Sequence, residues 1–156
     1  ERLLESVTAS EQYGYPVYRT LQPLYNLYDR EAFEKELEPV CAEHGIGVIS
    51  YYSLAQGFLT GKYRSEEDLV KSVRGGGIGN YLNERGFRIL KALDNVAAEF
   101  TCSPATIAIA WLHARPSVTA PIDSATNMEQ LSSLIRASQI VLDANSMTLL
   151  NNVSEW

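Results

Sequence analysis

The chain has 156 residues, enough for one domain or a substantial piece of one, with 46% hydrophobic and 21% charged residues. This balance is typical of a globular protein and argues against a disordered chain. The net charge of −6 opposes binding to nucleic acid or to an anionic membrane, and no apolar run approaches the roughly 20 residues that span a bilayer. We therefore expect neither nucleic acid nor a membrane as a partner.

The start of the chain and its two cysteines bear on its compartment. The opening sequence ERLLESV has neither the charged and apolar regions of a signal peptide nor an initiator Met, which suggests a fragment or a processed product. Cys41 and Cys102 fit no metal-binding spacing, and we expect two reduced thiols. Together these features predict a cytoplasmic protein.

The first predicted elements alternate between helix and strand. Residues 1–13 carry apolar side chains at helical spacing, and Gly14 ends this helix. Residues 16–23 form a β-rich run between prolines, which predicts a strand of about five residues. A second helix covers residues 30–45, in which Pro39 predicts a kink or two abutting helices.

The middle of the chain begins with a strand. Residues 46–51, IGVISY, form the kind of apolar run that is buried on both faces of a parallel sheet. Ser65, with Asp68 three residues later, predicts the start of a helix. The glycine-rich segment 75–80 is interpreted as a mobile loop, and residues 81–100 predict a strong amphipathic helix.

The last third of the chain continues the alternation. A helix predicted at 103–114 begins with a serine cap and is followed by a short strand at 116–122. The pattern TxxE at 126–129 is a capping box, so we expect a helix from about Asn127. A final amphipathic turn covers residues 147–153.

The element order α-β-α-β-α-α-β-α-α predicts an α/β fold built from parallel βαβ units. Only three strands are predicted, and a parallel sheet of three strands has two bare edges. Either further strands lie outside this chain or a partner covers the edges. Self-association through the open edges is one such possibility.

No standard catalytic or nucleotide-binding motif is present. GFLTGKY at 57–63 lacks the spacing of a P-loop and the Ser or Thr that follows its lysine, and GGGIGN does not follow a strand as a dinucleotide fingerprint does. His44 and His113 each lie at the end of a predicted helix, where a cation complements the helix dipole. The sequence has no metal-binding arrangement, so we expect no metal.

Positive charge gathers between residues 57 and 91, where seven cations stand against four anions. Lys62, Arg64 and Arg74 are candidates for contact with an anion, and chance clustering is the alternative. For the segment from Arg85 to Lys91 we prefer a solvated helix face.

Two strand ends are followed by residues that suit a phosphate. Tyr51 and Tyr52 end one strand and precede a loop of small residues that leads to Lys62. Ser124 follows the next strand and precedes the helix start at Thr126, where free N–H groups and the helix dipole favour an anion. The alternative is that the tyrosines are core and rim aromatics and that Thr126 is only a cap.

Four stretches together resemble the C-terminal half of an aldo-keto reductase, in the bacterial branch related to the potassium-channel β subunits: LQPLYNLYDRE, GIGVISYYSLAQGFLTGKYR, SPATIAIAWLHARPSVTAPI and SATNMEQL. They stand in the family's order and cover nearly the whole chain. The resemblance implies the C-terminal portion of a (β/α)8 TIM barrel, with its sixth, seventh and eighth strands near 17–22, 46–51 and 118–122. It also implies reduction of a small aldehyde or ketone by NADPH, bound in extended form across the C-terminal face of the barrel.

The same resemblance implies how NADP(H) is bound. Gln22 would contact the nicotinamide carboxamide, and Tyr51 would stack on the nicotinamide ring. The residues implied for the pyrophosphate are Tyr52, Ser53, Leu54, Ala55, Gln56 and Lys62, with Arg74 as a further contact. Those implied for the adenosine 2′-phosphate are Ser124, Thr126 and Gln130.

The sequence also departs from the family pattern. Tyr52 and Ser53 stand where the family loop often has Ser and Pro, and Ser133 and Leu134 replace an acidic residue and an Asn near the adenine. The family's Asp, Tyr, Lys and His tetrad comes from earlier strands, so we expect no catalytic residue here and an inactive chain by itself. The alternative is a non-catalytic half-barrel that acts as a nucleotide-binding or protein-interaction module.

Overall fold

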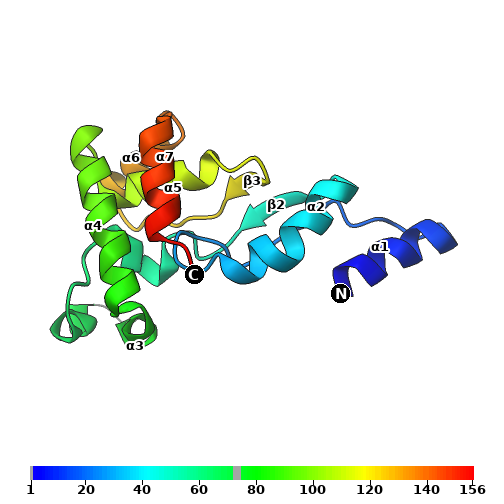
Figure 1. Ribbon diagram of the computed structural model, residues 1–156, viewed down its shortest axis with the longest axis horizontal. Coiled ribbons are helices and arrows are strands. Elements are labelled where there is room, and N and C mark those ends of the chain that lie inside the picture. Colours follow the sequence, from blue (N-terminus) through cyan, green and yellow to red (C-terminus); the bar gives the residue numbers. More distant parts are fainter. Residues whose placement is uncertain (1, 72–74) are drawn as a thin grey trace.

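A computed structural model describes residues 2–71 and 75–156 of the chain (Figure 1). The α-helices are α1 (Arg2–Tyr13), α2 (Glu38–His44), α3 (Gly75–Ile78), α4 (Glu84–Glu99), α5 (Pro104–His113), α6 (Met128–Ala137) and α7 (Ala144–Val153). The strands are β1 (Thr20–Leu21), β2 (Gly47–Ser50) and β3 (Val118–Pro121). One π-helical turn, η1 (Phe33–Leu37), and three 3₁₀ helices, η2 (Ala55–Thr60), η3 (Glu66–Lys71) and η4 (Gly79–Tyr81), complete the elements.

The three strands form one parallel sheet in the order β1-β2-β3, which confirms the predicted α/β class. Thr20 pairs with Gly47, the first residue of β2. Arg19 O still accepts from Gly47 N at 2.9 Å, but residues 16–18 lie before the start of β2 and have no described strand beside them. For this reason β1 has two residues where the sequence predicted about five.

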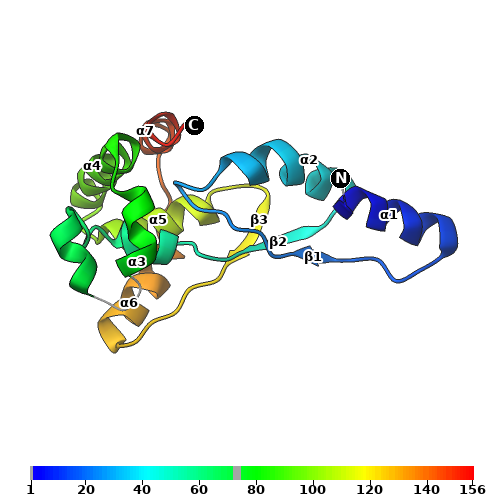
Figure 2. The ribbon, with the colours of Figure 1, turned by 90° about the horizontal axis from the view of Figure 1, so that it is seen from below.

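The two faces of the sheet differ in burial, so the prediction of a strand buried on both faces is wrong for β2. Val48 and Ser50 are fully buried, whereas Gly47 and Ile49, which point to the other face, are only half-buried. In Figure 2, α2 lies on one side of the strands, and no described helix runs along the opposite side. One face of the described sheet is therefore left open.

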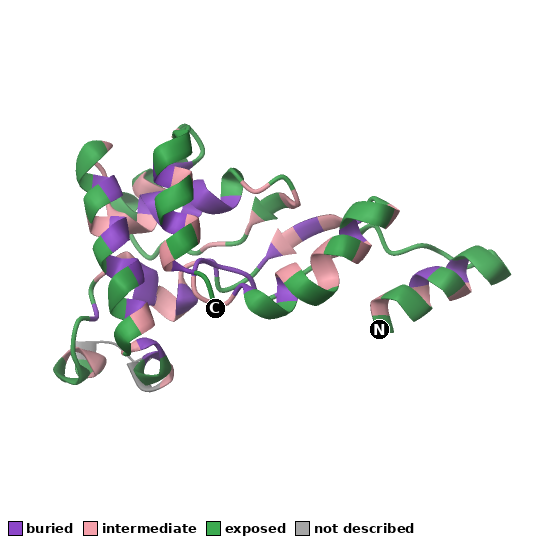
Figure 3. Ribbon diagram, in the orientation of Figure 1, coloured by how far each residue is buried: buried purple, intermediate pink, exposed green. Residues whose placement is uncertain are grey.

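The main core lies where α4, α5 and α7 meet, and it contains the side chains of Leu93, Trp111 and Leu150 (Figure 3). The stripe predicted within 81–100 is the buried face of α4, and the Asn83 side chain caps this helix by accepting from Gly86 N. At the far end of the molecule, α1 contacts α2 and is largely exposed (Figure 3). The chain therefore has a well-packed helical end and a thinly packed end.

Local signals for helix ends agree with the structure in several places. Gly45 ends α2 with φ 62°, a left-handed conformation that glycine adopts without steric cost. Pro39 occupies the first turn of α2, where it needs no N–H partner, and η1 runs directly into this turn. Residues 31–44 are helical without a break, and the irregularity beside Pro39 is the π-helical turn η1 that directly precedes α2.

Two sequence predictions of local structure are wrong. The glycine-rich segment is not a loop in its described part but forms α3 and η4, since Ile78 is fully buried and Gly77 lies directly against the Gln56 side chain. The cap of α6 is Asn127, which accepts from Gln130 N at 2.9 Å, and not Thr126. An asparagine directly before the helix competes well for this position.

Candidate functional site

The carboxyl ends of the three strands bring three loops together at one edge of the sheet. Gln22, Tyr51 and Ile122 each follow a strand directly. Tyr51 N donates to Pro23 O at 3.0 Å, and Ile122 N donates to Ser50 O at 2.8 Å. The loops are therefore held side by side just beyond the sheet, the arrangement from which parallel α/β folds build ligand sites.

Tyr51 and Tyr52 form an exposed aromatic pair at this edge. Tyr51 is 37% exposed and Tyr52 is 51% exposed, and the centroids of their rings lie 5.2 Å apart. These exposures exclude the interpretation of Tyr51 as a core aromatic. A flat ring in this position can stack on the ring of a ligand.

The loop after β2 has an unusual backbone. Tyr52, Ala55 and Gln56 have φ values of 53°, 48° and 58°, which side chains other than glycine rarely adopt. Backbone strain of this kind concentrates at ligand sites, where the surrounding structure holds it. The backbone N–H groups of Ser53 and Leu54 donate to no acceptor within residues 2–71 and 75–156, so they are available to an anion.

Two side chains hold this loop against its neighbours. Asn26 Nδ2 donates to Tyr52 O at 2.9 Å and to Asp29 Oδ2 at 3.0 Å. Ser53 Oγ donates to Ile122 O at 3.0 Å. Asn26 was missed in the sequence, although its spacing from Asp29 is typical of a turn in which an Asn side chain caps backbone N–H groups.

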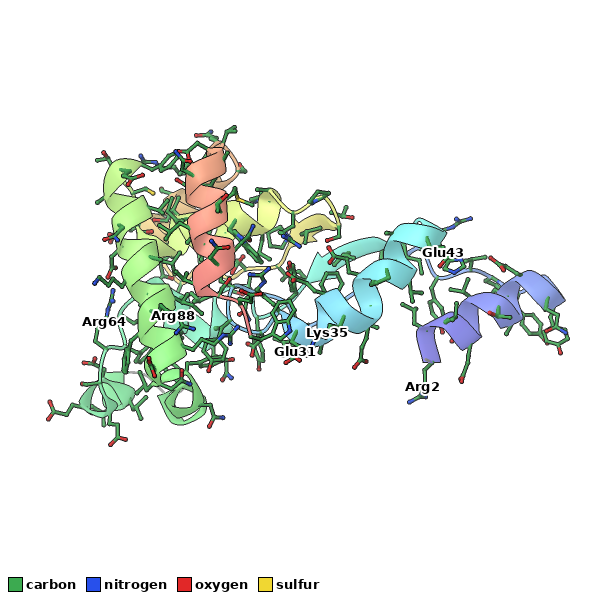
Figure 4. The ribbon with its side chains drawn as sticks, in the orientation of Figure 1. Arg2, Glu31, Lys35, Glu43, Arg64 and Arg88 are labelled. Atoms are coloured by element: carbon green, nitrogen blue, oxygen red, sulfur yellow. The ribbon has the colours of Figure 1, made fainter. Side chains whose placement is uncertain are left out.

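The three cations singled out as anion contacts differ in their surroundings. Lys62 Nζ lies 4.9 Å from the centre of the Tyr63 ring and 3.7 Å from the position of a Cβ atom built on Gly57, so it is beside the loop. Arg64, labelled in Figure 4, pairs with Asp94 of α4 at 2.7 Å, so its charge is balanced by a carboxylate of the chain and its contact with a bound anion stays a prediction. Arg74 lies outside the described residues.

The remaining residues implied for the pyrophosphate contribute mainly backbone. Ala55 is fully buried and Leu54 is half-buried. Gln56 is turned toward α3, where its side chain packs against Gly77. Its side chain therefore stabilises the loop from behind.

The three residues implied for the 2′-phosphate are exposed at the start of α6. Gln130 Oε1 accepts from Thr126 N at 2.8 Å and from Thr126 Oγ1 at 3.0 Å, which ties the chain before the helix to its first turn. Ser124 precedes this turn and is also exposed. The helix start thus offers a preformed, solvent-facing surface next to the carboxyl edge.

Asp123, which the sequence reading passed over, lies between the strand-end loops. Its Oδ2 atom is buried and has no hydrogen-bond partner in the described part of the chain, and the same holds for Ser50 Oγ. Burial raises the pKa of Asp123 to about 7, against the opposing effect of a hydrogen bond with Ser53. The signal for Asp123 in the sequence was a single acidic residue directly after the strand predicted at 116–122.

The described residues contain no group of His, Cys, Asp and Glu side chains arranged to hold a metal ion. No helix among them has the length and apolar character needed to cross a membrane. The candidate site is therefore the carboxyl edge, formed by backbone donors, aromatic rings and a lysine.

A sequence model of the aldo/keto reductase family matches residues 4–155. The chain belongs to the aldo/keto reductase family. This confirms the family resemblance drawn from the four stretches of sequence.

Curated members of the aldo/keto reductase family show distant similarity. A probable voltage-gated potassium channel subunit beta of Arabidopsis thaliana is 32% identical over 127 residues, which cover 77% of this chain and 38% of that protein. An uncharacterized oxidoreductase of Bacillus subtilis is 31% identical over 86% of this chain and 40% of its own length. An NADH-specific methylglyoxal reductase of Escherichia coli is 30% identical over 86% of this chain and 41% of its own length. The chain spans about two fifths of the length of these relatives.

Proposed function

We propose that this chain is the cofactor-binding portion of an NADPH-dependent carbonyl reductase. In this proposal β1, β2 and β3 are the sixth, seventh and eighth strands of a (β/α)8 barrel, and the substrate is a small aldehyde or ketone. The observation that supports it best is the meeting of three strand-end loops at one edge, with an exposed aromatic ring and N–H donors that have no acceptor among the described residues. Parallel barrels bind phosphate-bearing ligands at this edge.

The residues at the edge divide the cofactor between them. Gln22 and Tyr51 would hold the nicotinamide, which supplies a hydride to the substrate when the cofactor is bound. The N–H groups of Ser53 and Leu54 would bind the pyrophosphate, with Lys62 as a charged partner. Ser124, Thr126 and Gln130 would form the surface that binds the 2′-phosphate.

A proton donor for the carbonyl oxygen must come from another part of the protein. The tetrad that the family uses corresponds to none of the residues of this chain. We therefore propose that this portion binds and orients the cofactor, and that the chemistry is completed by residues contributed by the rest of a barrel.

A second candidate function is that of a non-catalytic binding or regulatory module. Two observations favour it: the open face of the sheet, and similarity to a protein named as a potassium channel subunit. The coding sequence upstream of Glu1 separates the candidates. A continuous reading frame that supplies the tetrad favours the reductase, and unrelated upstream sequence favours the module.

The reductase proposal is tested in a completed barrel, meaning this chain joined to the amino-terminal part of an aldo/keto reductase. Lys62→Ala should weaken NADPH binding about ten- to a hundredfold, the effect of losing a charge-assisted contact of about 1.5–3 kcal/mol. Tyr51→Ala should weaken NADH and NADPH alike, since both contain the nicotinamide. Gln130→Ala should weaken NADPH more than NADH. Fluorescence titration with both cofactors measures these effects.

The exposed residue Gln139, which follows α6, provides the matched control. Gln139→Ala should leave both affinities unchanged. An equal loss of NADH and NADPH affinity in Gln130→Ala would refute the assignment of the 2′-phosphate. No binding of either cofactor to the completed barrel would refute the proposed function.

A further inference from the structure

Asn26 belongs to the loop after β1, and it is fully buried where this loop meets the loop after β2. Its Oδ1 atom accepts from Tyr28 N at 2.8 Å and from Asp29 N at 2.9 Å. Its Nδ2 atom donates to Tyr52 O at 2.9 Å and to Asp29 Oδ2 at 3.0 Å. An asparagine amide has two donor protons and two acceptor positions, so all four are used and the orientation of this amide is fixed.

The hydrogen bond to Tyr52 O also acts on the N–H group that follows it. The Tyr52 carbonyl and the Ser53 N–H belong to one planar, trans peptide unit and point in opposite directions. Because Asn26 fixes the carbonyl, it also sets the direction of this N–H. Tyr52 has a φ of 53°, which a residue other than glycine keeps only where the surrounding structure holds it. Asn26 therefore stabilises a strained peptide whose N–H has no acceptor within residues 2–71 and 75–156.

A further hydrogen bond braces Asn26 from the side of η4. Tyr81 is buried, and its hydroxyl donates to Asp29 Oδ2 at 2.9 Å. This is the same oxygen that accepts from Asn26. The Tyr81 ring is stacked on the Phe58 ring of η2, with the two centroids 5.3 Å apart. A chain of hydrogen bonds thus runs from Tyr81 through Asp29 and Asn26 to the Tyr52 carbonyl, and ring packing holds its far end in place.

We propose that Asn26 is a positioning residue for the cofactor, which directs the N–H of Ser53 toward the pyrophosphate. This inference rests on the proposed function. Tyr81, acting through Asp29, keeps the Asn26 amide in the orientation that holds Tyr52. NADH, NADPH and ADP-ribose all contain the pyrophosphate, so the contribution of Asn26 is the same for the three ligands. In this respect it differs from the residues proposed for the nicotinamide and for the 2′-phosphate.

The turn at residues 26–29 uses only half of this amide. The hydrogen bonds that Oδ1 accepts from Tyr28 N and Asp29 N close the turn, as Asn and Ser side chains do in many turns. The hydrogen bond from Nδ2 to Tyr52 O leaves the turn and joins it to the next loop. In Asn26→Ser a hydroxyl can still accept from the turn, but the side chain is too short to reach Tyr52 O. This variant therefore removes the positioning bond and keeps the local one.

The first measurement is the affinity of the completed barrel for NADH and for ADP-ribose, which contains the pyrophosphate but no nicotinamide. By titration calorimetry, Asn26→Ser should weaken both about tenfold, which corresponds to about 1.4 kcal/mol. Tyr51→Ala should weaken NADH and leave ADP-ribose unchanged. Asn152→Ser, at an exposed position of α7, is the matched control and should change neither. If Asn26→Ser binds ADP-ribose as tightly as the unmodified barrel does, the proposal is wrong.

The second measurement follows the loop without any ligand, through the ¹⁵N-labelled amide of Ser53. We expect Asn26→Ser and Tyr81→Phe to shift this signal, and Asn152→Ser to leave it in place. Tyr81→Phe retains the ring on Phe58 and the whole Asn26 side chain, so it decides the question even if Asn26→Ser does not fold. A Ser53 amide and an ADP-ribose affinity that both ignore Tyr81→Phe would overturn the proposal.

A double variant separates positioning from a general loss of structure. Tyr81→Phe alone should weaken ADP-ribose about threefold, the effect of one weakened hydrogen bond. Because Tyr81 acts through Asn26, Tyr81→Phe should have no further effect in the Asn26→Ser background, and losses that add would contradict the chain of hydrogen bonds. If the unmodified barrel binds neither NADH nor ADP-ribose while the Ser53 amide responds as expected, the proposed function fails and the coupling within the loop stands.

Discussion

At the scale of single residues, Arg30 is the most constrained charge in the described chain. Arg30 is 6% exposed, and its guanidinium pairs with the Glu34 carboxylate at 2.9 Å. It also donates to Asn151 O at 3.1 Å and stacks 5.0 Å from the centre of the Trp111 ring. Arg30 therefore links η1 to the end of α7 through groups that are largely buried.

We expect Arg30→Ala to destabilise the fold by about 3–5 kcal/mol, because it leaves the largely enclosed Glu34 carboxylate, whose side chain is 11% exposed, without its main partner. Lys35→Ala is the matched control, since Lys35 pairs with Glu31 on the surface (Figure 4). A surface ion pair of this kind contributes about 0–1 kcal/mol to stability. Urea denaturation of the completed barrel measures both changes. Equal losses in the two variants would contradict the role assigned to burial.

At the scale of elements, the start of α4 depends on a close approach between segments. A Cβ atom at Gly86 would overlap Tyr81 O and lie 3.0 Å from Phe58 Cζ, so α4, η4 and η2 meet here without room for a side chain. A Cβ atom at Gly79, at the start of η4, would meet nothing within 4 Å. The two glycines therefore differ in packing.

Gly86→Ala should cost about 1–3 kcal/mol through overpacking against Tyr81 and Phe58. Gly79→Ala should be neutral or stabilise by about 0.4–1 kcal/mol, because alanine reduces the entropy of the unfolded chain. The midpoints of chemical denaturation of the two variants test this contrast. A stabilising Gly86→Ala would show that η4 is not held against α4 as described.

At the scale of the whole molecule, the chain leaves much of its sheet uncovered. Strands β1 and β3 each have one edge that pairs with no described strand, and Ile49 on the open face is only half-buried. Tyr18, two residues before β1, and Ile122, directly after β3, are exposed. Unpaired parallel edges of this kind readily pair with other chains.

Purified residues 1–156 should therefore self-associate. We expect sedimentation velocity to show species larger than a monomer of 17.3 kDa, and thermal unfolding to lack a single cooperative transition. Joining the chain to the amino-terminal part of a barrel should restore a discrete species by covering both edges. A sharp monomer peak with two-state melting of the 156-residue chain would contradict this expectation.

The sequence by itself determined the parts that depend on neighbours along the chain. The stop at Gly45 and the serine cap at Ser103 rest on backbone geometry and on side-chain bonds within one turn, and they appear where the pattern put them. The order of strands and helices predicted parallel pairing, so the meeting of Gln22 and Tyr51 at one edge followed from topology. Membership of the aldo/keto reductase family likewise rests on the sequence.

Only the tertiary structure decided which residues are buried beneath the carboxyl edge of the sheet. Asp123 and Ser53 are seventy positions apart, and nothing local indicates that the carboxyl loses its access to water. The half-buried face at Ile49 depends on which helices cover the sheet. The apolar sequence of β2 would be the same whether helices covered one face of the strand or both. Burial and hydrogen bonding between distant segments are sums over the folded chain, so no window of sequence contains them.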